Sequence, residues 1–325
     1  MRIGQNPEKS KQNQNVLKKH RIIVVFYIPD SQNNYFEDLD LVLNKCLETL
    51  FLSINEQTTA VTLINNNSSN SIDKVVDRYK NRIDKYVIYN DNKGKVYAII
   101  NEVKGVFEEF VTISDADVLF FDGWENAVFE IFKKVPKAGV VSPLPVPHCT
   151  FTYNNSVFFN TFINKIKYVN LLNKSDTELF KSSIDNDVAF RRKNNVYWDE
   201  KQLYLKKNKE LFLLGSTHFV ATYRKFIFDE INSFPKHKFK PGYENEFIDF
   251  LADKNGLYRL SAKKTYAYHI GNKLDEMTNN YFSEGNNTIS NDFFNTIPKT
   301  LKQNKILIYI KSILGRIAIK FIWDK

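Results

Sequence analysis

The stretch FVTISDADVLF, residues 110–120, joins the end of a predicted strand to two carboxylates. Residues 110–113 are aromatic or β-branched, which is typical of a strand, and a second apolar run begins at Val118. Asp115 and Asp117 lie between the two runs, one residue apart. The stretch therefore raises the question of why two acids follow what the apolar residues indicate is a buried strand.

The sequence before this stretch alternates between predicted strands and helices. RIIVVFYIP (21–29) is a continuous apolar run ended by proline, as expected of a strand buried on both faces. Further strands are predicted at 60–64, 85–89 and 110–114, with helices at 39–54, 72–79 and 96–103. This alternation predicts an α/β fold with a doubly wound, mostly parallel central sheet. Ligands of such sheets bind at the carboxyl ends of the strands, where the two acids lie.

The pattern is less regular after residue 122. Helices are predicted at 124–132 and 244–256, and strands at 138–143, 211–225 and 257–272. Residues 148–210 are rich in aromatic and polar side chains but show no clear period. No internal repeat is visible, so the chain is not expected to be a repeat protein.

Charge is concentrated at the two ends of the chain. The formal net charge is +9, of which residues 1–21 supply +5 and residues 299–325 supply +6, so subtracting +11 leaves −2 for the body. A nucleic-acid-binding protein would carry its basic patch on the folded body, so no nucleic-acid partner is expected. Basic ends suggest instead an anionic surface such as a membrane.

Cys46 and Cys149 are the only cysteines, and neither belongs to a CxxC motif. Two thiols do not make a disulfide framework, which favours a reducing compartment. The polar amino-terminal stretch, 1–20, shows no secretory signal and is expected to be a flexible basic lead-in.

Two carboxylates that flank a single residue can face one hard cation together. Mg²⁺ or Mn²⁺ takes oxygen ligands and can bind a phosphate group at the same time. Such an ion would offset the charge of a diphosphate and stabilise it as a leaving group. The alternative is a solvated turn, since Asp is common in turns.

Several segments between residues 21 and 272 together resemble the GT-A-fold glycosyltransferases, and among them the inverting family 2. They are the opening strand RIIVVFYIP, the turn INNNSSNSID, the segment NDNKGKVYAIIN, the acid pair in SDAD, the helix GYENEFIDFLADKNG and the late strand YHIGN. Glu244 and Gly256 have the family's acid-to-glycine spacing. The chain departs from the family at Asn65, where an Asp commonly holds the base, and at Asn245, where an Asp is frequent.

The resemblance implies a role for each matched residue. Asp117 would be the main metal ligand, with Asp115 sharing the metal or contacting the ribose, and His269 completing the site. The nucleotide would be lined by five residues besides Asp115: Pro29, Asn65, Asp91, Asn92 and Lys95. His218 lies in an apolar run and is expected to be structural.

The general base is assigned among the acids of GYENEFIDF. The DxD pair is committed to the metal on the leaving-group side, so it cannot also accept the proton of the attacking hydroxyl. Glu244 follows Gly242 near a helix start and is the first choice, and Glu246 is the second. Asp249 would lie off the face of Glu244 on a regular α-helix, where residues five apart diverge.

The predicted function is therefore a metal-dependent inverting glycosyltransferase that uses a nucleotide-diphosphate sugar, with UDP-sugars favoured and Mn²⁺ or Mg²⁺ as cofactor. The acceptor would be a glycan or a lipid-linked saccharide in bacterial surface polysaccharide synthesis.

Residues 21–147 would form the nucleotide-sugar-binding half, 148–275 the acceptor-binding and catalytic half, and 276–325 a carboxy-terminal extension. A nucleotidyltransferase is an alternative, although IPDSQNNYFED lacks a glycine-rich basic loop, and a non-catalytic membrane-associated scaffold is another.

The carboxy-terminal extension contains a predicted amphipathic helix, 301–323. On a helical wheel Lys302, Lys305, Arg316 and Lys320 share one arc, and apolar residues cover most of the remainder. Such a helix is expected to lie on an anionic membrane surface without spanning it, which would make the protein cytoplasmic and peripheral on the inner face of the cell membrane. Lys311 falls within the apolar arc, and a helix packed on the domain is the alternative.

Overall fold

The computed structural model describes residue 4 and residues 17–161, 165–186, 188–191, 197–285, 289–300 and 303–323. Within these residues one ten-stranded sheet runs through the molecule, in the order β3-β2-β1-β4-β10-β6-β11-β9-β8-β7, and β12 pairs with β5 in a separate ribbon. Most of the predicted basic segment 1–20, and Lys302, lie outside the described residues.

The central strands confirm the predicted mostly parallel α/β sheet. β1 is parallel to β2 and β4, β2 is parallel to β3, and β6 is parallel to β11. β10 is antiparallel to both β4 and β6, so those two strands also share a direction. The strands are β1 (His20–Phe26), β2 (Thr59–Asn65), β3 (Lys85–Ile88), β4 (Phe110–Asp115), β5 (Val118–Phe120), β6 (Ala138–Ser142), β7 (Ile166–Val169), β8 (Gln202–Lys207), β9 (Glu210–Leu214), β10 (Val220–Arg224), β11 (Tyr258–Ser261) and β12 (Ala267–His269).

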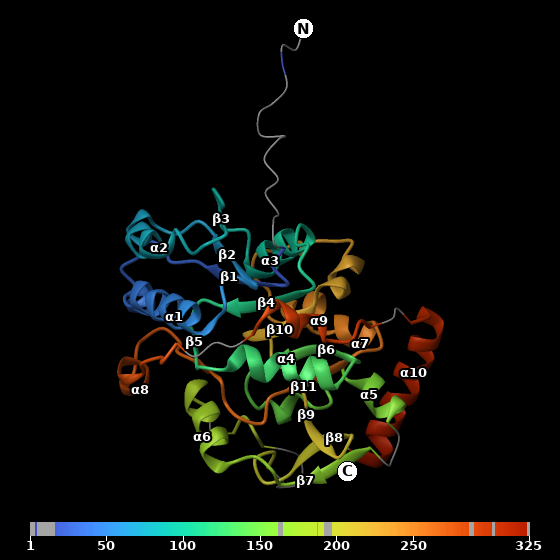
Figure 1. Ribbon diagram of the computed structural model, residues 1–325. Helices are drawn as coiled ribbons and strands as arrows, with labels where there is room; N and C mark the ends of the chain where they lie inside the picture. The colour runs from blue at the N-terminus through green and yellow to red at the C-terminus, as the bar shows by residue number, and fades with distance from the viewer. Residues whose placement is uncertain are drawn as a thin grey trace.

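Helices cover both faces of the sheet, so the molecule has three layers (Figure 1). The described helices are α1 (Leu39–Ser53), α2 (Asp73–Tyr79), α3 (Lys95–Lys104), α4 (Trp124–Lys134), α5 (Asn155–Asn160), α6 (Lys174–Ser183), α7 (Leu251–Lys254), α8 (Glu276–Asn280), α9 (Asn291–Asn295) and α10 (Lys305–Ala318). Short 3₁₀ segments are η2 (Asn34–Phe36), η3 (Asn70–Ile72), η4 (Pro147–Cys149) and η6 (Lys225–Glu230), and η7 (Asn245–Asp249) and η8 (Ile319–Trp323) are π-helical.

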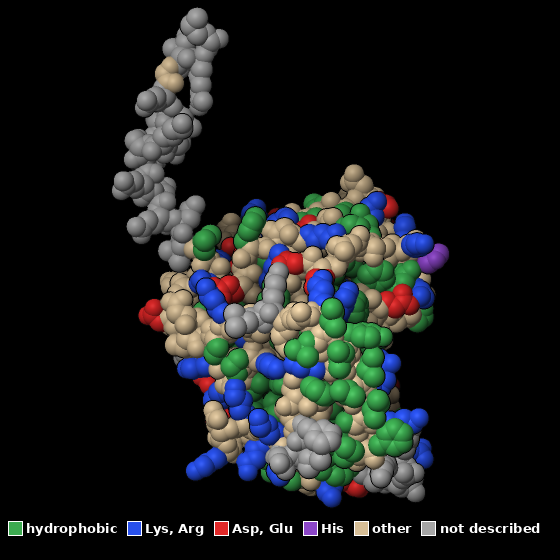
Figure 2. All heavy atoms as spheres, turned by 90° about the vertical axis from the view of Figure 1, so that its right-hand side faces the viewer, with side chains coloured by type: hydrophobic (Ala, Val, Ile, Leu, Met, Phe, Trp, Pro, Cys, Tyr) green, Lys and Arg blue, Asp and Glu red, His purple; other side chains and the backbone are tan. Residues whose placement is uncertain are grey.

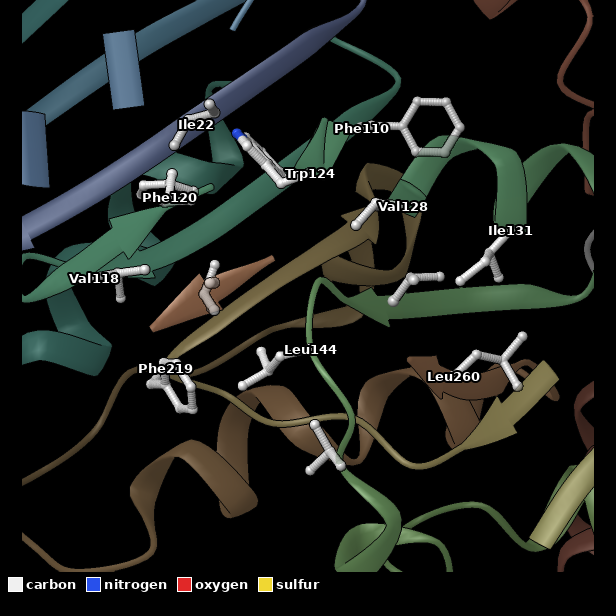
Figure 3. Close-up of a cluster of buried hydrophobic side chains, with 14 of the residues drawn as sticks. Ile22, Phe110, Val118, Phe120, Trp124, Val128, Ile131, Leu144, Phe219 and Leu260 are labelled. Atoms are coloured by element: carbon white, nitrogen blue, oxygen red, sulfur yellow. The ribbon is translucent and has the colours of Figure 1, made fainter. Parts of the chain in front are cut away.

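The side chains of β1 explain why a continuous apolar run forms a central strand. Ile22 and Val24 point into a core shared with α1 and α4, while Ile23 and Val25 point into a second core shared with α3. Successive side chains of a strand face opposite sides, so a strand covered on both faces has no polar positions. Figure 3 shows Ile22 and Phe110 in the first core, near Trp124.

Two segments that the sequence predicts as single strands are each two strands in different places. Residues 211–225 contain β9 and β10, which are separated in the sheet by β6 and β11. Residues 257–272 contain β11 in the large sheet and β12 in the ribbon with β5. The break after β9 is at Gly215, whose φ of +112° is a conformation that other residues rarely adopt.

The predicted helix 244–256 is also irregular. It begins with the π-helical turn η7 and continues as the short helix α7. A π-turn joins residue i to residue i+5, so residues five apart return to nearly the same side, which an α-helix does not allow. The α-helical spacing that separated Asp249 from Glu244 therefore does not apply to this segment.

The sheet is continuous across the predicted boundary at residue 147, because β6 lies between strands from later in the chain. The apolar core below it also draws residues from before and after that point. The division into a donor half and an acceptor half stays a prediction about function.

The carboxy-terminal helix α10 packs on the body of the protein. Gly315 approaches α5 so closely that a Cβ placed there would lie 2.0 Å from the carbonyl oxygen of Asn155. Ile308 and Ala318 are buried in the same interface, and Trp323 lies 6.2 Å from Phe158, centroid to centroid. None of the helices in the described ranges is long and apolar enough to cross a membrane.

Candidate active site

The two acids of SDAD lie where β4 ends, at the carboxyl edge of the parallel strands. Asp115 is the last residue of β4, and its backbone N–H donates to the carbonyl oxygen of Phe219 at 2.7 Å. Asp117 follows one residue later, just before β5 begins. Both side chains are about three-quarters buried, with exposed fractions of 23% and 28%. The acids are thus side chains of a cleft at the end of a buried strand and not of a solvated turn.

His269 reaches the same place through the small ribbon. β12 pairs antiparallel with β5, which sets His269 opposite Val118 and lets the N–H of Ile270 donate to the carbonyl of Asp117 at 2.7 Å. His269 Nε2 lies 3.4 Å from Asp117 Oδ2. One ligand atom from each of Asp115, Asp117 and His269 lies within 4.8 Å of the others, so the three residues predicted as metal ligands form one cluster.

The ligand atoms that this cluster offers fit a divalent cation. Asp117 Oδ1 is buried, and it has no hydrogen-bond partner among the described residues. Burial raises the pKa of the Asp117 carboxyl to about 6, and the charge of Asp115 adds to the rise while His269 opposes it. Two carboxylates and one imidazole suit Mn²⁺, and the carboxylates also suit Mg²⁺. A cation there would satisfy the buried oxygen and offset the repulsion between the acids.

Lys95 connects this cluster to the π-turn. It is the first residue of α3, and its ammonium forms an ion pair with Asp115 Oδ1. The same Nζ lies 3.6 Å from Glu244 Oε1. Burial alone would lower the pKa of Lys95, but the charges of Asp115 and Glu244 outweigh it and the pKa is raised. Lys95 is therefore a fixed positive charge between two acids from opposite halves of the chain.

A cavity of about 310 Å³ opens beside the acids. Asn66, Asn92 and Lys95 line it together with Asp115 and Asp117. Aromatic side chains form much of the remaining wall, and two of them are largely exposed, Tyr35 at 59% and Phe239 at 73%. The other lining residues are Val25, Phe26, Tyr27, Ile28, Phe36, Leu39, Val42, Leu43 and Ala116.

The residues predicted to line a nucleotide divide into two groups. Asn92 and Lys95 face the cavity, as does Asp115. Pro29 and Asp91 are not among the cavity-lining residues, and Asp91 instead pairs with Lys93 at 2.7 Å.

Asn65 is buried, and its side chain is occupied within the protein. Its Oδ1 accepts from the N–H of Ser68 at 2.7 Å, and its Nδ2 donates to the hydroxyl of Tyr86 at 3.1 Å. The next residue, Asn66, lines the cavity and binds Asn92 at 2.9 Å. The run NNN (65–67) was the signal for Asn66, but sequence alone could not say which asparagine faces the cavity.

The two candidate bases lie in different environments. Glu244 is about one-quarter exposed and lies beside Lys95 in the cleft. Glu246 is about half exposed and pairs with Lys240 at the surface. The structure brings Glu244 to the metal cluster and leaves Glu246 outside it.

His218 differs from its prediction as a structural residue of an apolar strand. It lies in the loop between β9 and β10, and its side chain is 44% exposed. Its Nδ1 lies 3.2 Å from Asp249 Oδ2, and Asp249 is buried against Arg259 at 3.2 Å. The contact between His218 and Asp249 could not be predicted from α-helical spacing, because Asp249 lies in a π-turn.

Comparison with known proteins identifies a family for the chain. The model of the family described as "Glycosyl transferase family 2" matches residues 35–231, more than half of the chain. A search of curated proteins finds no match.

Solved structures with a similar fold share little sequence with the chain. S. aureus TarS 1-349 has 13% identity and a TM-score of 0.46, with 77% of this chain and 60% of that chain covered. The mannosyltransferase PcManGT from Pyrobaculum calidifontis, solved with GDP-Man and Mn²⁺, has 13% identity and a TM-score of 0.42, with 76% and 55% covered. The chain thus spans less than two thirds of the length of these proteins. The extent of the family match, together with the GT-A-like sheet, shows that the chain belongs to glycosyl transferase family 2.

Proposed function

We propose that the protein is a metal-dependent inverting glycosyltransferase that transfers a sugar from a nucleotide-diphosphate donor. The observation that carries the proposal is the cluster of Asp115, Asp117 and His269 at the mouth of a cavity of about 310 Å³. Family membership supports sugar transfer in general. The cluster supports the metal, because a buried oxygen of Asp117 has no protein partner in the described ranges.

The side chains around the cavity suit the parts of such a donor. When bound, Mn²⁺ or Mg²⁺ would be held by the cluster and would offset the charge of the leaving diphosphate. The Lys95 ammonium lies on the same side and adds a second positive charge. Asn66 and Asn92 offer amide groups for the ribose or base, and Tyr35 and Phe239 offer exposed rings on which a flat base can stack.

The side chains of the site support a nucleotide-diphosphate donor as a class, but they do not select one sugar or one acceptor. UDP-sugars are the first donors to test, and a glycan or a lipid-linked saccharide of a bacterial surface polysaccharide is the acceptor class that we propose. Inversion requires a proton acceptor opposite the leaving diphosphate. Glu244 stays a prediction for that role.

The proposal is tested by thermal unfolding with UDP-glucose, UDP-N-acetylglucosamine and GDP-mannose, each with and without Mn²⁺. A ligand at about 100 times its Kd stabilises the folded state by about 2.7 kcal/mol, so a rise in Tm on the order of a few °C is expected for one donor, only with metal. Asp117→Asn should remove this rise. Asp77→Asn is the matched control, because Asp77 is 68% exposed on α2.

Analysis of the released products, together with the unfolding experiment, separates the alternatives. A glycosyltransferase releases a nucleoside diphosphate from the donor, whereas a nucleotidyltransferase acting on a nucleoside triphosphate releases pyrophosphate. A non-catalytic scaffold would show neither product and no metal-dependent rise in Tm. Release of pyrophosphate from a nucleoside triphosphate, or the absence of both products and of the metal-dependent rise in Tm, would overturn the proposed reaction.

We also propose that α10 holds the protein on an anionic membrane surface. The helix packs on the body and at the same time exposes a continuous apolar face, which contains Ile306, Leu307, Tyr309, Ile310, Ile313, Leu314, Ile317 and Phe321 at 42–71% exposure. Figure 2 faces the side of the molecule that carries α10 and shows hydrophobic side chains gathered in a band, with basic side chains around it. Docking and membrane binding therefore use opposite faces of one helix and are not alternatives.

Charges on the helix agree with this orientation. Arg316 and Lys320 lie beside the apolar face, where they could meet lipid phosphates. Lys311 is on the docked side and donates to Gln303 at 3.4 Å, so it does not interrupt the exposed face. Lys305 pairs with Glu230 at 3.1 Å. A peripheral position on the inner face of the cell membrane is the location that we propose.

Co-sedimentation with vesicles tests whether the exposed apolar face of α10 binds a membrane. Ile313→Asp with Ile317→Asp should abolish binding to vesicles that contain phosphatidylserine, and neutral phosphatidylcholine vesicles should bind the wild-type chain weakly. Phe107→Asp is the control, because Phe107 is 95% exposed on another part of the molecule. Unchanged binding by the double variant, or no binding of the wild-type chain to vesicles that contain phosphatidylserine, would rule out the membrane as the occupant of this face.

A further inference from the structure

The loop between β9 and β10, residues 215–219, places an imidazole at the edge of the proposed active site. Phe219 binds the backbone of Asp115 and packs edge-on against His269, ring centroids 5.3 Å apart. His218 is the preceding residue, and the charges of both Lys95 and Glu244 act on it. The ring therefore lies near Lys95 and Glu244, beside the metal cluster, but is not itself part of that cluster.

A buried carboxylate fixes the orientation of this imidazole. Asp249 is 2% exposed and accepts from Nδ1 of His218 at 3.2 Å. Its other oxygen pairs with the guanidinium of Arg259, which is 1% exposed and also donates to the carbonyl of Ser216 at 2.7 Å. Because an ionised Asp accepts only, Nδ1 carries the hydrogen, and Nε2 keeps a free lone pair.

The second nitrogen is available to a substrate. The His218 side chain is 44% exposed, and Nε2 has no hydrogen-bond partner among the described residues. A half-exposed imidazole whose other nitrogen is held by a buried carboxylate has the arrangement of a general base with its positioning residue. A histidine that only capped a strand would not need a buried ion pair behind it.

We propose that His218 is the general base of the glycosyl transfer and that Asp249 positions it. The proposal rests on the proposed function, and it replaces Glu244 in that role. In the step, Nε2 of His218 takes the proton of the acceptor hydroxyl, and the hydroxyl oxygen forms a bond to the anomeric carbon. The bond from that carbon to the diphosphate oxygen breaks, and its electron pair leaves with the nucleoside diphosphate. The imidazolium that results is stabilised by Asp249.

The surroundings of Glu244 argue against it as the base. Its carboxylate lies 3.6 Å from the Lys95 ammonium, which also pairs with Asp115. It is thus bound to the positive charge on the leaving-group side of the site. That position does not suit a base, because the proton acceptor for inversion must lie opposite the leaving diphosphate. Asn245 follows it, and an amide cannot accept the proton.

Four charged groups set the protonation of His218. Burial lowers its pKa, but the hydrogen bond and charge of Asp249 outweigh that effect and the pKa is raised above its usual value. Lys95 acts to lower it and Glu244 to raise it, while Arg259 is neutralised by Asp249. Because only the neutral imidazole accepts a proton, turnover should rise as the pH increases through the raised pKa of His218 and then level off.

His218→Gln tests the role, with His237→Gln as the control because His237 is exposed on the loop before the π-turn. Turnover is measured as nucleoside diphosphate released from UDP-glucose, UDP-N-acetylglucosamine and GDP-mannose with Mn²⁺, water serving as acceptor. His218→Gln should lower kcat roughly 10²–10⁴-fold and leave the donor KM nearly unchanged. The control should keep wild-type kcat.

Two further measurements separate a base from a structural residue. Added imidazole should restore part of the activity of His218→Ala, and the rise of kcat with pH that the wild-type chain shows should disappear in His218→Gln. Full activity of His218→Gln, or an inactive His218→Ala that imidazole does not rescue, would overturn the proposal. If Glu244→Gln were inactive and His218→Gln active, the role of general base would be assigned to Glu244. If the wild-type chain turned over no donor, the proposed function itself would fail, and this inference with it.

Discussion

Asp249→Asn is the substitution for which the structure gives the largest expected cost. The carboxylate and the Arg259 guanidinium are both almost fully buried, with exposed fractions of 2% and 1%. Removing one partner of a buried ion pair leaves the other charge uncompensated, which costs about 3–5 kcal/mol. Arg259 would keep its bonds to the carbonyls of Asp249 and Ser216, so the lower end, about 3 kcal/mol, is expected at pH 7.

The cost should also depend on pH. Burial alone would raise the pKa of Asp249, but Arg259 and His218 outweigh it and hold the pKa below its usual value. A carboxyl whose pKa is lowered by folding adds stability above its unfolded pKa, about 3.9, and loses it as the pH falls. The difference between wild type and Asp249→Asn should therefore be complete at pH 7 and shrink below about pH 4.

Urea unfolding followed by far-UV circular dichroism measures both quantities. Glu246→Gln is the matched control, because Glu246 lies on the same π-turn but forms an exposed pair with Lys240. Its free energy of unfolding should equal that of wild type within error, since exposed ion pairs contribute little. A cost below about 1 kcal/mol for Asp249→Asn at pH 7, or a difference that stays constant down to pH 3, would show that the buried pair does not stabilise the fold.

Three further predictions concern close approaches and a buried thiol. Gly94→Ala should lower Tm and weaken donor binding, because φ there is +82° and a Cβ would lie 2.2 Å from the carbonyl oxygen of Lys238; a wild-type Tm would contradict this. Gly315→Ala should cost about 1–3 kcal/mol in urea unfolding, since its Cβ would meet the carbonyl oxygen of Asn155, and an unchanged free energy would mean that α10 does not dock as described. Cys46 should resist iodoacetamide at pH 8 in the folded protein and react in urea, because burial raises the pKa of its thiol to about 12; rapid labelling of the native chain, measured by mass spectrometry, would refute its burial.

The first half of the fold was predictable because its signals are local. The strands at 20–26, 59–65 and 110–115 are almost wholly buried and rich in apolar and β-branched residues, so their composition and length identify them without knowledge of the strands they pair with. The helices between them carry the 3.6-residue period. Their alternation then restricts the topology, which the observed strand order confirms.

The second half of the fold depends on features that the periodicity of apolar residues does not reveal. Residues 211–225 resemble a strand along their length, yet a glycine with a φ of +112° separates β9 from β10, which lie in two places in the sheet. Whether a helical segment contains a π-turn is decided by packing, so the approach of Asp249 to His218 was not predictable from spacing. Asn65 and Asn66 have the same chemistry, and only the path of the turn shows which faces the cavity.

The three residues predicted as metal ligands lie together in the structure, and the predictions for them had two different origins. Asp115 and Asp117 were placed by the strand before them, which is a derivation from the residues. His269 was placed by resemblance to a family, because nothing local in YHIGN indicates that β12 pairs with β5. The metal itself, like the reaction, stays a proposal.

The pairing of β12 with β5 also has a consequence for the newly made chain. A ribosome delivers the strands β1 to β4 and both acids long before it delivers His269, and chains fold largely in the order of synthesis. The cluster is therefore completed late, when the ribbon closes over Asp117. A nascent or truncated chain that stops before β12 would have two facing acids and no third ligand. If the cluster binds a cation as proposed, full cation affinity would require that β12 had been made and paired with β5.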